Sequence, residues 1–118
     1  MKAIQGDLTD LKVLYDRHKG RLPVTFDQMA ECLKDWAIWR IEEDSTPVAV
    51  VLEKDGHGHI AAYGGAHVGI PRMRWALKTL GITKTTVGDG FPLGHALAKR
   101  LGFVIYRKAN GVSYYVRS

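Results

Sequence analysis

The stretch from Gly58 to Gly81 constrains the fold of this chain more than any other. It reads as a strand at His59–Tyr63, a loop that contains glycines, and a helix from Pro71 to Leu80 that ends at Gly81. A helix start exposes backbone N–H groups without partners in the helix, and the peptide dipoles add partial positive charge there. Glycine lets a backbone approach a ligand closely. The stretch therefore predicts either an anion site, most often for a phosphate, or a plain strand-to-helix corner.

The elements around this stretch follow the order β-α-α-β-β-β-α-β-α-β-β. Helix signals are the cap Asp7, the capping box Thr25–Gln28 and Pro92 at a first helical position. A strand, a helix and a second strand of one sheet form a parallel pair by a right-handed crossover. We therefore predict an α+β (α/β) fold with a mostly antiparallel sheet. Its one parallel pair would be His59–Tyr63 beside Ile82–Val87, splayed at the carboxyl ends, where ligands tend to bind.

Length and composition limit the class of protein. A chain of 118 residues predicts a single domain, residues 1–118. One cysteine, Cys32, allows no internal disulfide, and we expect it to be a small buried side chain. No apolar run approaches the length of a membrane span, and the first residues form no apolar signal segment. We expect a soluble, cytoplasmic protein with no membrane partner.

Basic residues concentrate in the second half of the chain. The net charge is +5, and between residues 71 and 118 nine Lys and Arg face a single acid, Asp89. Such a surface fits a polyanionic partner, either a phosphorylated cofactor or a nucleic acid. The aromatic residues are not interleaved with the charges, as a base-stacking platform would require, so we do not expect a nucleic-acid partner.

Two helices have apolar faces that predict which residues are buried. In the helix that starts at Asp7, the face consists of Leu8, Leu11, Leu14 and Tyr15. In the helix that starts at Pro92, it consists of Leu93, Ala96, Leu97 and Leu101. Both faces should pack on the sheet.

The element order and the segment His95–Phe103, which ends in Leu-Gly-Phe, resemble the GNAT superfamily (GCN5-related N-acetyltransferases). The resemblance covers nearly the whole chain in order, but only this segment matches well in residues. The chain is also similar to short GNAT-like proteins of tailed bacteriophages. The resemblance implies a GNAT-like fold and an acyl-CoA-dependent N-acyltransferase. Its substrates would be acetyl-coenzyme A (acetyl-CoA) and an amine of a small molecule or protein.

The same resemblance implies which residues hold the cofactor. The strand before the loop would pair with the pantetheine arm, and loop amides would hold the pyrophosphate. Here the strand residues are Ala61, Ala62 and Tyr63, and the phosphate group is His67, Val68, Gly69, Ile70 and Arg72. Arg74 adds a further positive charge to the same helical turn.

Three residues are candidates for proton transfer. Histidine titrates nearest neutral pH, so His67 beside the cofactor and His95 on the closing helix are candidate acids or bases. Tyr63 is a candidate donor to the leaving sulfur. For each of these residues a packing or surface role is the alternative.

Several other polar residues are weaker candidates. Asp89, Glu42 and Glu43 lie at strand or loop ends where substrate contacts are possible, or they are ordinary turn and strand-end residues. His57 and His59 could share a metal ion, but no third ligand has suitable spacing, so we predict no metal site.

A second function remains open. The tyrosine that often acts as general acid in the GNAT closing helix corresponds to Ala98, and the glycine loop departs from the family pattern. The alternative is therefore a catalytically degenerate GNAT-fold binding module, for example a phage protein that engages a host protein.

Overall fold

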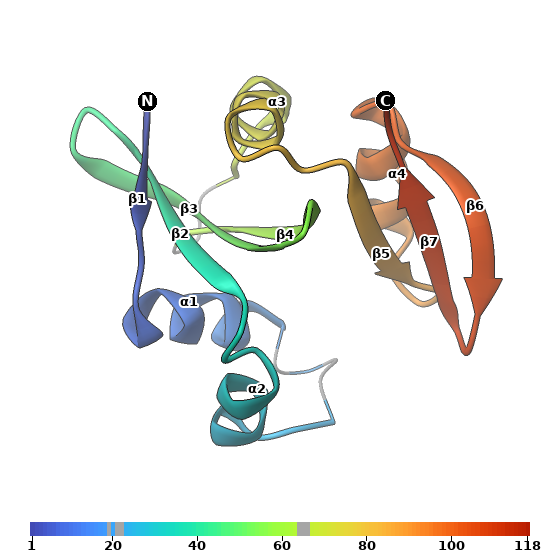
Figure 1. The fold of residues 1–118 in the computed structure, drawn as a ribbon, viewed down its shortest axis with the longest axis horizontal. Helices are drawn as coiled ribbons and strands as arrows, with labels where there is room; N and C mark the ends of the chain where they lie inside the picture. The colour runs from blue at the N-terminus through green and yellow to red at the C-terminus, as the bar shows by residue number, and fades with distance from the viewer. Residues whose placement is uncertain (19, 21–22, 64–66) are drawn as a thin grey trace.

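A computed structural model describes residues 1–18, 20, 23–63 and 67–118 (Figure 1). Within these residues the expected element order is observed. The elements are β1 (Lys2–Gln5), α1 (Leu8–His18), α2 (Phe26–Cys32), β2 (Ala37–Glu43), β3 (Thr46–Lys54), β4 (His57–Ala62), α3 (Ile70–Thr79), β5 (Lys84–Gly88), α4 (Pro92–Arg100), β6 (Val104–Ala109) and β7 (Val112–Val116).

The described strands form one mixed sheet in the order β1-β2-β3-β4-β5-β7-β6. Every neighbouring pair is antiparallel except β4 and β5, which are parallel. In Figure 1, the strands β5, β7 and β6 lie together and diverge from the first four strands of the sheet. The predicted fold class, including its single parallel pair, is confirmed.

Local signals in the sequence start the first two helices. The Asp7 carboxylate accepts a hydrogen bond from the Thr9 amide at 2.9 Å, which caps α1. Thr25 and Gln28 form the predicted capping box at the start of α2. Tight turns with left-handed residues, such as Asp55 and Gly56, join the antiparallel strands.

Apolar residues pack on both faces of β3, whose central residues 49–52 are almost fully buried. One cluster joins the sheet to α1 and α2 and includes Leu11, Leu14 and Val50. The other joins it to α3 and α4 and includes Leu77 and Ala98. The continuous apolar run of β3 reflects this burial from two sides. No helix in the described part of the chain is long and apolar enough to cross a membrane.

Some predicted burial is wrong. Leu8 is 60% exposed and Leu93 is 64% exposed, and Ala96 is exposed as well. In α1 the charged Asp10 is buried together with Leu11 and Leu14. In α4 the buried residue is Ala98. Cys32 is exposed. Periodicity identifies an amphipathic helix, but helix rotation depends on the surface it packs against.

Candidate functional site

The parallel strands β4 and β5 meet at only one end. The described residues share one register pair, His57 with Lys84, and the Thr85 hydroxyl donates to the Gly58 carbonyl at 2.8 Å. A Cβ on Gly58 would lie 2.6 Å from Ile82, so glycine is needed at this junction. Beyond it, β4 continues to Ala62 along β3, while β5 follows β7. The strands therefore part toward their carboxyl ends, as the sequence predicted.

The first turn of α3 directly follows the described loop residues 67–69. Gly69 precedes the helix with φ 84° and ψ 148°, and no side chain caps the helix. This backbone conformation favours glycine. Pro71 in the first turn has no N–H, and the first intrahelical bond runs from the Met73 amide to the Gly69 carbonyl at 3.1 Å. The amides of Ile70 and Arg72 are thus placed to bind an anion.

The two arginines of α3 differ in their partners. Arg72 Nε donates to Glu43 Oε2 at 2.6 Å. The Nη1 atom of Arg72 lies 3.5 Å from the Val68 carbonyl. Arg74 donates to the Arg100 carbonyl at the end of α4, at 3.3 Å. Arg72 therefore lies by the helix start with an acidic partner, whereas Arg74 links α3 to α4.

The other predicted cofactor residues differ in their exposure to solvent. Ala61 and Ala62 are buried within β4, and Val68 is buried beside α3. His67 is exposed. The sequence pattern also offers Gly65 for close approach of the backbone to a ligand, but residues 64–66 lie outside the described part of the chain.

Tyr63 points toward α1. Its hydroxyl donates to Asp10 Oδ1 at 3.3 Å, and Arg40 donates to the other carboxylate oxygen of Asp10 at 3.3 Å. The Asp7 amide adds a third bond, at 3.0 Å. Burial, followed by the charge of Asp10, raises the pKa of Tyr63, so its hydroxyl keeps its proton at neutral pH. Asp10 was not among the predicted site residues, although an acid beside the apolar residues Leu11 and Leu14 of the same helix was a usable signal.

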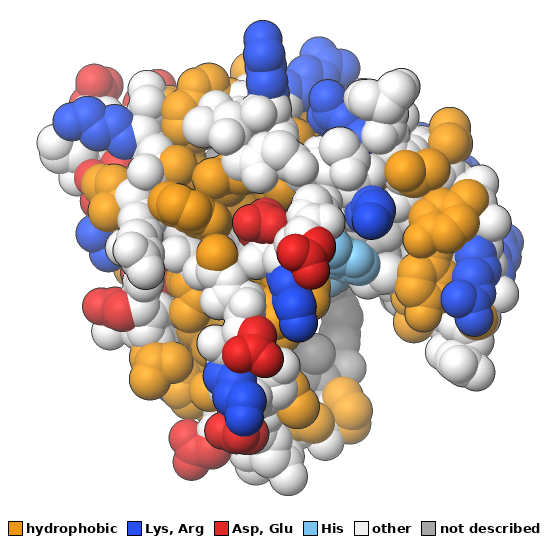
Figure 2. Space-filling view, viewed as in Figure 1, with side chains coloured by type: hydrophobic (Ala, Val, Ile, Leu, Met, Phe, Trp, Pro, Cys, Tyr) orange, Lys and Arg blue, Asp and Glu red, His pale blue; other side chains and the backbone are white. Residues whose placement is uncertain are grey.

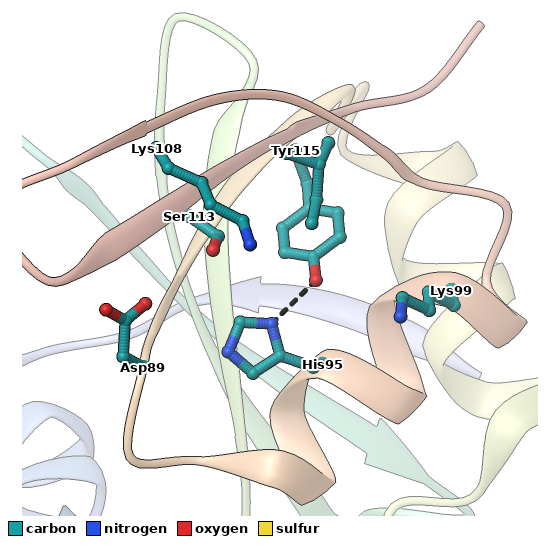
Figure 3. Close-up of a pocket in the computed structure, with 7 residues that line it drawn as sticks. Asp89, His95, Lys99, Lys108, Ser113 and Tyr115 are labelled. Atoms are coloured by element: carbon teal, nitrogen blue, oxygen red, sulfur yellow. Dashed lines mark hydrogen bonds between the residues drawn. The ribbon is translucent and has the colours of Figure 1, made fainter.

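His95 lies under the C-terminal hairpin (Figure 3). Its Nδ1 is 2.6 Å from the Tyr115 hydroxyl and its Nε2 is 3.0 Å from the Gly88 carbonyl. A carbonyl only accepts, so Nε2 carries the proton and Nδ1 accepts from Tyr115. Burial raises the pKa of Tyr115. These residues border an open hollow of about 380 Å³, which is also lined by Asp89, Lys99, Ile105, Lys108 and Ser113.

The weaker candidates also have defined places. Glu42 pairs with Arg40 at 2.9 Å, and Glu43 pairs with Arg72. Asp89 borders the hollow beside His95. Within the described ranges no group of three potential ligands could hold a metal ion.

The fold is similar to solved N-acetyltransferase structures. A variant of spermidine N-acetyltransferase SpeG from Vibrio cholerae superposes with a TM-score of 0.68 at 14% identity, covering 99% of this chain and 94% of that one. Campylobacter jejuni N-acetyltransferase PseH in complex with acetyl coenzyme A superposes with a TM-score of 0.58 at 14% identity, covering 97% and 96%. No family model and no curated protein sequence matches this chain. The neighbours are GNAT-fold N-acetyltransferases and establish the fold; a phage origin stays a prediction.

Proposed function

We propose, from its GNAT fold, that this chain is an N-acetyltransferase that moves an acetyl group from acetyl-CoA to an amine. The observation that carries the proposal is the parting of β4 and β5 directly before the uncapped start of α3. The gap offers unpaired strand edges to an extended chain, and the helix start offers amides to a diphosphate. Acetyl-CoA has both groups in that order, and the neighbour PseH is solved with it.

The proposed cofactor runs along β4 from its end toward its beginning. The pyrophosphate would bind the backbone from His67 to Ile70 and the amide of Arg72, with Arg72 supplying charge after partial release from Glu43. The pantetheine arm would follow the backbone of Tyr63, Ala62 and Ala61. The thioester would then lie near the junction where Thr85 binds the Gly58 carbonyl.

The polar residues named above have distinct proposed roles. Tyr63 holds its proton at neutral pH, but it follows the opposite end of β4 from the proposed thioester, so its proposed role is contact with the pantetheine arm and not proton donation to the leaving sulfur. His67 is exposed next to the phosphate position and is a candidate for contact with the cofactor. His95 could act as a base only if its Nδ1 exchanged Tyr115 for substrate. The acceptor is a primary amine, for which spermidine is the first compound to test because SpeG is named as a spermidine N-acetyltransferase.

One observation favours the alternative of a catalytically inactive binding module. Ala98, at the position of the tyrosine that often serves as general acid in the family, is 6% exposed and packs in the core. The methyl group of Ala98 has no proton to donate to a leaving thiolate. In this second candidate the cleft binds acetyl-CoA or a host protein without chemistry.

Calorimetry and a thiol-release assay together test the proposal. We expect acetyl-CoA to bind with one site per chain and free thiol to appear when spermidine or a lysine peptide is added. R72Q should weaken cofactor binding more than R74Q, because Arg72 lies by the helix start whereas Arg74 binds the Arg100 carbonyl at the end of α4. No heat of binding at millimolar acetyl-CoA would refute the proposal. Binding without turnover of any amine would favour the binding module.

A further inference from the structure

The hollow beneath the C-terminal hairpin is built from α4, β6, β7 and the loop after β5. His95 and Lys99 are one helical turn apart on α4, so their side chains lie on one face of that helix. Ser113 and Tyr115 alternate along β7 and point to one face of the sheet. Figure 3 shows the Ser113 hydroxyl and the Lys108 ammonium pointing into the space above His95. Polar groups from separate elements therefore meet around one space.

The charged groups of this hollow are not paired with one another. Lys99, Lys108 and Asp89 all border it, and the ion pairs found within the described ranges involve other residues. Two ammonium groups and one carboxylate give the lining a positive charge. A positive lining without nearby counter-charges favours an anionic ligand.

Ser113 contributes a buried hydroxyl to the same space. The residue is 1% exposed, and its hydroxyl forms no hydrogen bond within the part of the chain that the structure describes. Its neighbours already have partners, because the Tyr115 hydroxyl donates to His95 and His95 donates to the Gly88 carbonyl. Buried polar side chains in folded proteins usually have a hydrogen-bond partner. Ser113 is therefore available to donate a hydrogen bond to a ligand in the hollow.

The surface around the hollow is also basic. Asp89 is the single acid among residues 71–118, against nine Lys and Arg. Figure 2 shows blue Lys and Arg side chains together with orange hydrophobic ones over β6 and β7, at the right of the view, while the red acidic side chains lie over the rest of this face. The electric field of this half of the molecule therefore attracts anions toward the hollow.

We infer that this hollow binds the phosphate group of a small phosphate monoester. Lysine ammonium groups bind phosphate as point charges, and two of them balance a group that carries a charge of about −1.5 to −2 at pH 7. Lys99 and Lys108 supply these charges, and the Ser113 hydroxyl donates to one phosphate oxygen. Ile105 offers an apolar contact to the organic part of the ligand. The volume of about 380 Å³ falls within the range of small-molecule sites, about 300–1,000 Å³.

NMR titration of the wild-type protein with phenyl phosphate tests the site. We expect saturable binding in the millimolar range that shifts the resonances of His95, Lys108 and Ser113. Inorganic phosphate should shift the same resonances at higher concentration, because it has no organic part to contact Ile105. Benzoate should bind more weakly than phenyl phosphate, because it carries a single charge. Equal affinity for benzoate would overturn the phosphate assignment, and shifts confined to other residues would overturn the site.

Four variants separate specific binding from general attraction. K99Q and K108Q should each weaken phenyl phosphate binding about fivefold, since each removes a charged donor. S113A leaves every charge in place and should weaken binding about threefold through the lost hydrogen bond. D89N removes the repelling carboxylate and should tighten binding about threefold. An unchanged affinity in both lysine variants and in S113A would overturn the site.

The matched control is R107Q, which removes the same unit charge at the residue before Lys108. Arg107 lies over the Tyr114 ring, 5.3 Å from its centroid, and Tyr114 alternates with Ser113 and faces away from the hollow. R107Q should therefore bind phenyl phosphate as the wild type does. Equal losses in R107Q and K108Q would show that net charge alone attracts the anion and would overturn the site.

A competition experiment separates this site from the proposed cofactor cleft, on which it does not depend. R72Q should leave phenyl phosphate binding unchanged, and acetyl-CoA should not displace phenyl phosphate. Displacement by acetyl-CoA together with loss of binding in R72Q would place the anion at the start of α3 and overturn the site. Failure of acetyl-CoA to bind would refute the proposed function and leave the hollow as a phosphate site.

Discussion

Arg72 Nε and Glu43 Oε2 lie 2.6 Å apart and join the first turn of α3 to the end of β2. Both side chains are about two-fifths exposed, at 38% and 41%, so the pair contributes little to stability. Its place matters more, because Glu43 competes with any anion at the helix start for the same guanidinium.

We therefore expect E43Q to tighten acetyl-CoA binding a few-fold and R72Q to weaken it about tenfold, since a hydrogen bond to a charged group contributes roughly 1.5–3 kcal/mol. Calorimetry at two salt concentrations measures both effects, and the R72Q protein should show the weaker salt dependence. Equal affinity in E43Q and R72Q would show that the phosphates bind elsewhere.

Replacing Gly69 by alanine should strain the entry to α3. At φ 84° a side chain raises the backbone energy by about 1–3 kcal/mol, so G69A should lower the unfolding free energy and weaken acetyl-CoA binding together. The matched control is G20A, because no atom of the described residues lies within 4 Å of a Cβ added to Gly20, whose φ is not left-handed. Thermal unfolding with and without acetyl-CoA compares the two variants. A G69A protein as stable as G20A would contradict the argument.

Removal of the buried Asp10 carboxylate should destabilise the protein strongly. Asp10 is 1% exposed and binds Arg40, Tyr63 and the Asp7 amide. D10A removes the acceptor of the Asp7 amide and of the Tyr63 hydroxyl, while Arg40 keeps its pair with Glu42, and we expect a loss of about 2 kcal/mol in denaturant unfolding. D16A, on the same helix, breaks only an exposed pair with Lys12 and should change stability by under about 1 kcal/mol. Similar losses in both variants would contradict this difference in burial.

Acid should destabilise the protein through His59. Its folded pKa of about 4 lies below the ordinary value of 6.5, so the unfolded chain binds the proton first as pH falls. The stabilisation is complete above pH 6.5 and is lost toward pH 4, with about 2 kcal/mol lost between pH 7 and pH 5. Urea unfolding at several pH values measures this slope. H59Q should flatten it, whereas H67Q, at an exposed histidine, should keep it; a slope unchanged in H59Q would assign the effect to other groups.

The predictability of the fold and of the site differs for physical reasons. Capping boxes, proline at helix starts and paired turn residues act over a few positions, so the element order could be predicted from them. Some strands begin one or two residues away from their predicted starts, because pairing with the neighbouring strand decides where a strand begins. For example, β4 starts at His57, which pairs with Lys54, and not at the predicted His59. The rotation of α1 and α4 could not be predicted, because Leu8 and Leu93 are apolar but meet no packing surface.

The sequence by itself determined the mixed sheet, its one parallel pair and the glycine-led start of α3, because local backbone preferences and chain connectivity specify these features. Only the tertiary structure decided which polar groups meet. It places Tyr63 on Asp10, His95 on Tyr115, and His59 on His57. Such contacts join residues brought together by strand pairing and helix packing, and their distances depend on side-chain directions that no periodicity in the chain encodes.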